Sequence, residues 1–455
     1  MSRIAVHIND AGITVLSGDR ISYREPGFAL LDDDQLRTGN EAFRQARIHP
    51  RRIQHRFWSN LSMDPLQDRR FRHLTAADLV SRQIEQVWQQ RTADADGMVV
   101  AVPSYMKPEN LGLFLGIAGE LNIPVVALVD AAVAATRREY RQAVPVHIEM
   151  SLHTTTLTRL AQPGQAQIER SEVIDSSGVY QLYETWINAV AEAFVQQSRF
   201  DPLHTAETEQ ILLNRLGGWL TDASSHQQLE LQIDHGGRSY QAVLDSLRLV
   251  DAAAPVYQLI SNKLRALYRA EDVPAIQVTD RVARMPGLAD MLKARVGGEI
   301  FVLEPGATAR GALSRCQDAT PAGSGMTLIR QLPWDQSPVA LQVPEDLERD
   351  ARSPTYLLVG STAHRIGNSP LFLGSQEDEG GRLIALPTEI PGVSRQHCSL
   401  TRKNGQCILE DHSRYGTFLN GHRIDGSSVL QVGDTIRIGT PGLEFQLITT
   451  DDVNG

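Results

Sequence analysis

One stretch near the end of the chain, residues 392–421, constrains the fold more than any other. It reads GVSRQHCSLTRKNGQCILEDHSRYGTFLNG, in which polar turns alternate with short apolar segments. Apolar segments this short, bounded by glycine and asparagine, favour β-strands over helices. The pair Asn420-Gly421 follows an apolar segment, and both residue types tolerate a positive φ, so it predicts a tight hairpin. The stretch therefore predicts part of a β-sandwich with its turns at one end.

The turns of this stretch carry side chains that suit an anion. Hydroxyl, guanidinium and imidazole groups on loops held by a rigid scaffold are a common way to build a binding site. The first turn contains Ser394, Arg395 and His397, and the second contains Ser413, Arg414 and Tyr415. These residues are the first candidates for a functional site.

The order of the motifs resembles a forkhead-associated (FHA) domain. The spacing S-R-x-H is followed by S-x-x-G-T, by N-G, and by the pattern L-x-x-G-D-x-I-x-I-G over residues 430–439. The resemblance implies an all-β sandwich, expected over residues 353–450, whose loops capture phosphothreonine peptides. A phosphothreonine brings nearly two negative charges and three acceptor oxygens, which such loops satisfy with donors.

The resemblance also assigns roles to single residues. Ser394 is expected to donate to the phosphate, Arg395 to add positive potential, and His397 to brace the loop from behind. Asn420 is expected either to fix its hairpin or to contact the peptide backbone. The remaining candidates are Ser413, Arg414 and Tyr415 for peptide binding, and Gly374, Gly416, Thr417 and Gly421 for the structural motif.

Two positions depart from the family pattern. The family's phosphate-binding arginine follows a glycine at the end of an early strand, but here Gly374 is followed by Ser375. Arg382 lies seven residues further on and is a candidate to fold back and replace the missing charge. Tyr415 stands where the family usually has a peptide-contacting asparagine. These departures leave a phosphate-independent protein contact as an alternative.

The length and charge of the chain limit its class. A chain of 455 residues is long enough for two or three domains, each with its own core. A net charge of −10 argues against a general affinity for nucleic acid or for an anionic membrane. No apolar stretch suits a membrane span or a signal peptide. With only three cysteines, we expect a cytoplasmic protein whose thiols are free.

The first 320 residues alternate between strand and helix patterns, which predicts an α/β layer structure. We expect this domain to be joined to the sandwich by a linker, residues 321–352, which contains proline and glycine. The pattern of a hairpin occurs near the N-terminus and again after residue 144, so two α/β halves are expected. The expected elements are hairpins over 3–15 and 144–160, strands over 97–103 and 125–129, and helices over 75–88, 108–121 and 131–140.

A second resemblance covers most of residues 1–318. The segment MVVAVPSYMKPENLGLFLGIAGELNIPVVALVDAAVAA is similar to actin-like ATPases of the DnaK, or heat-shock-70, class. TGNEAFRQARIHPR and residues 277–315 resemble an early helix and the late adenosine-contacting segment of the same class. This resemblance implies a two-lobed fold that binds ATP with Mg²⁺ between its lobes.

The phosphate chemistry of that class is mostly missing. His7 and Asn9 stand in the first phosphate loop, and residues 149–154 of the second loop contain no glycine. Thr279-Asp280-Arg281 replaces the glycine pair of the adenosine site. We therefore expect a degenerate pseudo-ATPase without a cofactor, while ATP with Mg²⁺ is kept as an alternative. The residues retained as nucleotide-binding candidates are Asp10, Glu149, Gly306 and Gly311.

The leading hypothesis is a non-enzymatic cytoplasmic adaptor or scaffold. Its sandwich is expected to dock a phosphothreonine-bearing protein, which implies a Ser/Thr kinase in the same system, and the pseudo-ATPase domain offers a second interaction surface. One alternative is a divergent DnaK-like ATPase or chaperone regulated by its FHA domain. The chain contains no phosphate-binding P-loop, zinc-ligand or nucleophile-elbow motif, so we name no catalytic or metal-binding residue.

Overall fold

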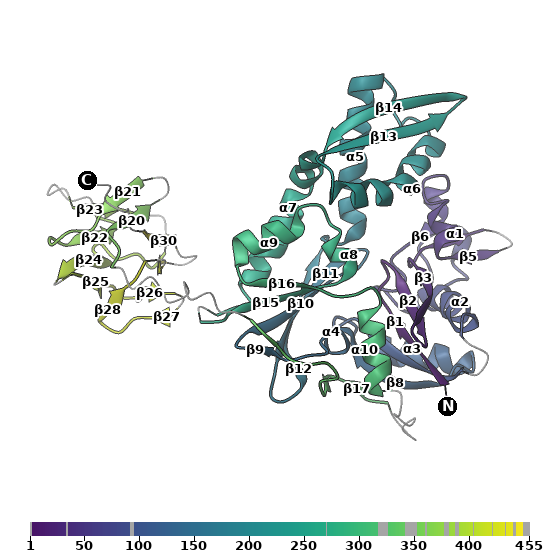
Figure 1. Cartoon of the computed structure of the whole chain (residues 1–455), viewed down its shortest axis with the longest axis horizontal. Coiled ribbons are helices and arrows are strands. Elements are labelled where there is room, and N and C mark those ends of the chain that lie inside the picture. Colours follow the sequence, from purple (N-terminus) through teal and green to yellow (C-terminus); the bar gives the residue numbers. More distant parts are fainter. Residues whose placement is uncertain are drawn as a thin grey trace. The chain divides into compact units, whose positions relative to one another are not determined.

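The structure, a computed structural model, forms two compact units, Met1–Leu341 and Gln342–Gly455, here called unit 1 and unit 2 (Figure 1). Each unit has its own hydrophobic core. The description below covers residues 2–32, 35–91, 95–269, 271–316, 326–341, 353–359, 362–376, 382–386, 391–403, 405–420, 422–432, 434–439 and 443–448.

The first sheet of unit 1 has six strands in the order β17-β8-β7-β1-β2-β3. Strands β1, β2 and β3 form an antiparallel meander, whereas β7, β8 and β17 continue from β1 as parallel neighbours. Five consecutive residues of β7, from Met98 to Val102, are fully buried, as expected of a strand covered on both faces. The strands are β1 (Ser2–His7), β2 (Ile13–Ser17), β3 (Arg20–Glu25), β7 (Ala95–Val102), β8 (Val125–Asp130) and β17 (Leu328–Ile329).

The second sheet of unit 1 has the order β16-β15-β10-β11-β12-β18, and five of its strands repeat the arrangement of the first sheet. Strands β10, β11 and β12 form the antiparallel meander, and β15 and β16 are the parallel neighbours of β10. The sixth strands differ, because β17 extends the parallel side of the first sheet whereas β18 pairs antiparallel with β12 on the meander side of the second. The strands are β10 (Val144–Met150), β11 (Thr154–Ala161), β12 (Ala166–Asp175), β15 (Pro274–Val278), β16 (Glu299–Val302) and β18 (Gln331–Leu332).

Hydrogen bonds at helix ends set the bounds of two helices of unit 1. Helix α2 (Ala76–Gln89) starts with a reciprocal capping box between Thr75 and Asp78. Helix α4 (Ala131–Ala135) ends before the predicted residue 140, because Arg315 donates to the carbonyl oxygen of Val133 and so satisfies that helix end. The others are α1 (Asn40–Phe43), α3 (Pro108–Glu120), α5 (Val179–Ser198), α6 (Ala206–Ala223), α7 (Ser246–Arg265), α8 (Asp280–Ala283), α9 (Leu288–Val296) and α10 (Ala307–Cys316).

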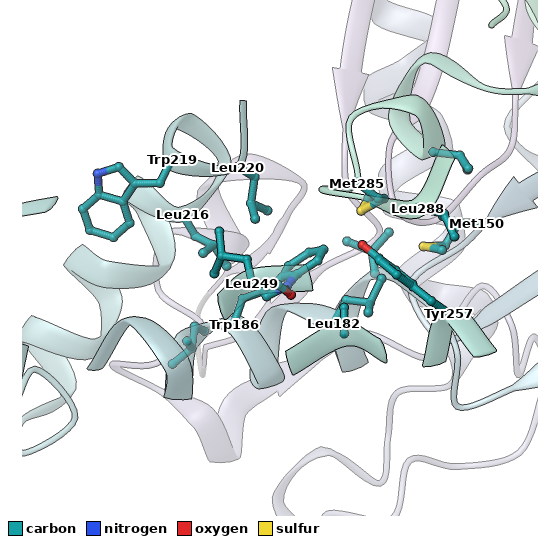
Figure 2. Packing of buried hydrophobic residues seen from close by; sticks show 14 of the residues in the cluster. Met150, Leu182, Trp186, Leu216, Trp219, Leu220, Leu249, Tyr257, Met285 and Leu288 are labelled. Atoms are coloured by element: carbon teal, nitrogen blue, oxygen red, sulfur yellow. The ribbon is translucent and has the colours of Figure 1, made fainter. Parts of the chain in front are cut away.

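The largest core cluster of unit 1 lies where α5, α6 and α7 pack together above the second sheet (Figure 2). Trp186 is fully buried there, and its indole N–H donates to the carbonyl oxygen of Leu249 at 2.8 Å. This bond lets a large aromatic side chain be buried without an unpaired donor. Further strands of unit 1, outside the two large sheets, are β4 (Ala29–Leu31), β5 (Leu36–Thr38), β6 (Ile53–Gln54), β9 (Tyr140–Arg141), β13 (Gln228–His235) and β14 (Arg238–Asp245).

The described part of the predicted linker, residues 326–341, belongs to unit 1. Strand β17 joins the first sheet and β18 joins the second, with only Arg330 between them. Strand β19 (Val339–Ala340) then pairs with β9. Asp335 accepts three hydrogen bonds from the Arg137 guanidinium, which holds the segment against unit 1. Unit 1 therefore extends further along the chain than expected, because residues 326–341 pair with strands that lie far away in the sequence.

Unit 2 is a β-sandwich of two sheets. One sheet has the order β21-β20-β30-β29-β26-β27 and the other β23-β22-β24-β25-β28, and their inward-facing residues form one core cluster. The strands are β20 (Tyr356–Val359), β21 (Thr362–Arg365), β22 (Leu371–Gly374), β23 (Leu383–Ala385), β24 (Cys398–Lys403), β25 (Gln406–Asp411), β26 (Phe418–Leu419), β27 (His422–Arg423), β28 (Ser427–Leu430), β29 (Thr435–Ile438) and β30 (Leu443–Ile448).

Candidate functional site

The candidate site of unit 2 begins at the end of β22, where the chain passes very close to the loop before β24. A Cβ atom on Gly374 would lie only 1.9 Å from the carbonyl oxygen of Arg395, so this approach requires glycine. Backbone bonds fix the contact: Ser375 N donates to Ser394 O at 3.1 Å, and His397 N donates to Leu373 O at 2.7 Å. The loop that carries Ser394 is thus anchored to a sheet.

The side chain of His397 supports this loop from inside. It is fully buried, accepts from the backbone N–H of Ser394 through Nδ1 at 3.1 Å, and lies 3.3 Å from the carbonyl oxygen of Gly416 through Nε2. An acceptor at Nδ1 and a donor at Nε2 require the neutral imidazole. Burial holds the pKa of His397 below its ordinary value, which favours that form.

The second turn is organised by Asp411, a residue that the sequence analysis did not single out. Its carboxylate accepts from the backbone N–H of Ser413 at 3.0 Å and from the hydroxyl of buried Thr417 at 2.8 Å. Burial alone would raise the pKa of Asp411, but these hydrogen bonds outweigh it and leave the pKa below its ordinary value. Ser413 in turn accepts from the backbone N–H of Gly416 at 2.7 Å. An Asp-x-Ser turn in the sequence was the available signal.

One hydrogen bond joins the two turns. The backbone N–H of Arg414 donates to the hydroxyl oxygen of Ser394 at 3.2 Å. Because that hydroxyl acts here as an acceptor, its own proton is left to donate to a ligand. The side chains of Arg395 and Arg414 are exposed, and neither forms an ion pair with another residue in the described part of unit 2. Tyr415 follows them with 65% of its surface exposed.

Asn420 fixes its hairpin. It adopts a positive φ of 51°, its amide donates to Asp434 at 2.8 Å, and its carbonyl oxygen accepts from the backbone N–H of Thr435 at 3.0 Å. Both ends of the amide are therefore used within unit 2. Gly416 also has a positive φ, of 94°, beside the Arg423 side chain. Gly421 lies outside the described residues.

Arg382 lies at the other end of β22 from Ser394. Leu383, the next residue, pairs with Phe372, whereas the Ser394 loop is bound to residues beyond Leu373. The Arg382 guanidinium donates to the carbonyl oxygens of Ser369 at 2.7 Å and Arg365 at 3.2 Å. The structure thus does not bring Arg382 to the site, because it precedes strand β23, which runs parallel to β22 and begins beside the start of β22. Ser375 does lie beside Ser394.

Comparison with known families agrees with this geometry. Residues 374–439 match the FHA domain model. Unit 2 contains an FHA domain. Such domains mediate phosphothreonine-dependent protein interactions, and Ser394, Arg395 and Arg414 all lie within the matched region.

A relative with a curated description shares only this part of the chain. Nibrin of Danio rerio is 36% identical over 85 residues, which is 18% of this chain. The same match spans 10% of the length of Nibrin, so the chain covers about a tenth of that relative. The similarity therefore bears on a single domain.

Unit 1 brings two of the nucleotide-binding candidates together in a closed cleft. Glu149, at the end of β10, forms an ion pair with His7 at 2.5 Å and accepts from Asn9 at 3.0 Å. Asp10 accepts from the backbone N–H of Leu152 at 2.7 Å. Burial alone would raise the pKa of Glu149, but the neighbouring His7 brings it down to about 2. The two loops are bonded directly to each other.

The remaining space of this cleft is small. Arg281 packs against Gly12, where an added Cβ would lie 2.2 Å from Nη2 of the arginine. The cavity lined by both residues and by Gly306 measures about 30 Å³, enough for a water molecule but far below the several hundred Å³ of a ligand pocket. Gly311 is not part of it: this glycine lets α10 approach the carbonyl oxygen of Ala134.

Within the residues the structure describes, no three His, Cys, Asp or Glu side chains gather closely enough to hold a metal ion. In the same part of the chain, none of the helices combines the length and apolar character needed to cross a membrane.

Proposed function

We propose that the protein is a non-enzymatic adaptor whose FHA domain docks a phosphothreonine-bearing protein. The single observation that carries this proposal is the bond between Arg414 N and Ser394 Oγ. It leaves the hydroxyl proton of Ser394 free to donate, and the same two turns carry Arg395 and Arg414, which form no ion pair with the described residues of unit 2. A phosphate ester supplies the acceptor oxygens and negative charge that such donors bind.

The missing arginine after Gly374 is compatible with this proposal. Ser375 contributes no charge, but its neighbour Ser394 is flanked by Arg395 and faces Arg414. The positive charge is then supplied by the two turns themselves. A Ser/Thr kinase that phosphorylates the partner is the upstream activity that this function requires.

We further propose that unit 1 is a degenerate actin-like domain that serves as a scaffold. The topology that five strands of each of its two large sheets share supports a duplicated α/β fold of that kind. The direct bonds from His7 and Asn9 to Glu149, together with the 30 Å³ cavity, favour a pseudo-ATPase over an ATPase. Addition of ATP with Mg²⁺ is expected to leave the melting temperature unchanged, and a raised melting temperature or measurable hydrolysis would favour a divergent ATPase instead.

Calorimetry with the full-length chain tests the adaptor function. A degenerate phosphothreonine peptide pool and its unphosphorylated twin are titrated into the native protein, into Ser394→Ala and into Ser427→Ala, a matched exposed serine on β28. We expect only the phosphorylated pool to bind. Ser394→Ala should bind it at least tenfold more weakly than the native protein, and Ser427→Ala should bind it as tightly as the native protein. Equal binding of both pools would favour the phosphate-independent alternative, and binding of neither would overturn the proposal.

A further inference from the structure

Unit 1 contains a second cavity, of about 210 Å³, that the proposed function does not use. Ala11 and Leu152 both line it, so it lies next to the closed cleft. One side is formed by residues around α1 and β6, and the other by α5 and α6. Its walls therefore come from both sheet-bearing halves of unit 1.

The walls of this cavity are largely aromatic and already ordered. Phe28 and Phe43 meet edge to face with ring centroids 5.2 Å apart. The His55 ring stacks on Tyr180 at 4.5 Å, and Tyr183 lines the cavity from the same helix. Because these rings already pack against one another, they lose little conformational freedom when a planar ligand binds between them.

The polar groups of the cavity are few and uncharged overall. Arg47 and Glu184 line it but form an ion pair with each other, and Arg47 also pairs with Glu209 at 3.3 Å. Asn40 and Tyr183 also line the cavity, and within the described part of the chain the side chain of neither forms a hydrogen bond. A ligand that fits these walls is neutral and offers them a donor and an acceptor.

We propose that this cavity binds a neutral, planar, fused two-ring heteroaromatic molecule. An apolar cavity of roughly 150 Å³ is known to hold one benzene ring, so a cavity of about 210 Å³ has room for a second fused ring. Stacking between the aromatic walls supplies the affinity, and Asn40 and Tyr183 orient the ring nitrogens. Because both halves of unit 1 contact the ligand, binding stabilises the folded unit.

The test uses the full-length protein with two neutral probes, indole and benzimidazole, and the anionic analogue indole-3-carboxylate. Saturation-transfer NMR and thermal melting report binding. Two variants change the cavity: Ala46→Leu fills it, and Tyr183→Phe removes one hydroxyl. Tyr240→Phe, at a ring that stacks on Phe200 outside the cavity, is the matched control.

We expect at least one neutral probe to bind and to raise the melting temperature, with the anionic analogue at least tenfold weaker. Ala46→Leu should weaken binding at least tenfold, Tyr183→Phe about fivefold, and Tyr240→Phe not at all. If Ala46→Leu fails to fold by circular dichroism, Tyr183→Phe and Asn40→Leu decide instead. Failure of both neutral probes at millimolar concentration, or binding that no cavity variant weakens, overturns the proposal.

Discussion

The imidazole of His397 accepts the backbone N–H of Ser394 at 3.1 Å. The same ring reaches Gly416 O on the second turn, so one buried side chain positions both turns of the candidate site. Arg414 N, which bonds Ser394 Oγ, comes from that second turn as well. The candidate hydrogen-bond donors of unit 2 are thus arranged by a residue that lies behind them.

His397→Ala should loosen both turns. It removes two hydrogen bonds and leaves a buried backbone N–H and carbonyl without partners, for an expected loss of about 2–4 kcal/mol in the local stability of unit 2. Hydrogen exchange measured by mass spectrometry on residues 391–417 should show faster exchange. His364→Ala on β21, which lacks such bonds in the described residues, is the matched control, and equal protection in the two variants would contradict the assigned role.

Gly374→Ala should be among the most damaging single changes in unit 2. The added Cβ meets the carbonyl oxygen of Arg395 at 1.9 Å, so β22 and the Ser394 loop must separate, at a cost of about 3–5 kcal/mol. Gly405→Ala is the control: it has a positive φ of 82° but open space around it, and costs only about 1–2 kcal/mol. Hydrogen-exchange protection of β22 and β24 distinguishes the two variants. A similar loss of protection in Gly374→Ala and Gly405→Ala would argue against a steric cause.

The charges on the turns should govern phosphopeptide affinity and its dependence on salt. Arg395→Gln and Arg414→Gln are each expected to weaken binding by about 1 kcal/mol, roughly fivefold, and to reduce the effect of added salt. Arg382→Gln is the matched control, because its guanidinium is bound to Ser369 O and Arg365 O. Fluorescence anisotropy at two ionic strengths measures this. A larger loss with Arg382→Gln than with the other two would point to a different site.

Asp10→Asn should change how the stability of unit 1 depends on pH. Burial raises the pKa of Asp10 to about 6 from an ordinary value of 3.8, so the folded chain holds this proton more tightly than the unfolded chain does. The resulting stabilisation is complete below pH 3.8 and is lost as the pH rises through 6. The stability of Asp10→Asn relative to the native chain should therefore rise by about 2.4 kcal/mol between pH 4 and 7.

Urea unfolding followed by tryptophan fluorescence at several pH values measures this difference. Asp19→Asn is the control, since the Asp19 side chain is 98% exposed. A difference that stays constant with pH would show that Asp10 is not buried as an acid of raised pKa.

Local patterns in the sequence predicted much of the fold. The Thr75 cap, the buried strand before Pro103 and the hairpins at both sheets depend on neighbouring residues, and the structure contains each of them. The sandwich strands of unit 2 were predicted for the same reason. The apolar pattern over residues 326–332 is compatible with an edge strand, but the pairing of β17 and β18 could not be predicted. Their partners β8 and β12 lie more than a hundred residues away in the sequence and belong to separate sheets.

The residues of the candidate sites also differ in how far local sequence patterns predict them. Ser394 and His397 were predicted from their spacing, but Asp411 was not, because its role depends on accepting from both Ser413 and Thr417 in the folded turn. Arg382 was proposed for the site from its distance along the chain, whereas the pairing of β23 with β22 puts it at the end of β22 away from Ser394. The packing of Arg281 on Gly12 joins residues far apart in sequence, and no local pattern indicates it.

The order of α10, β17, β18 and β19 along the chain has a mechanical consequence. A pull on the chain beyond Leu341 would load the pairing of β19 with β9 first, then that of β18 with β12, then that of β17 with β8. The edge strands β18 and β17 would therefore separate before the other five strands of either large sheet bear the load.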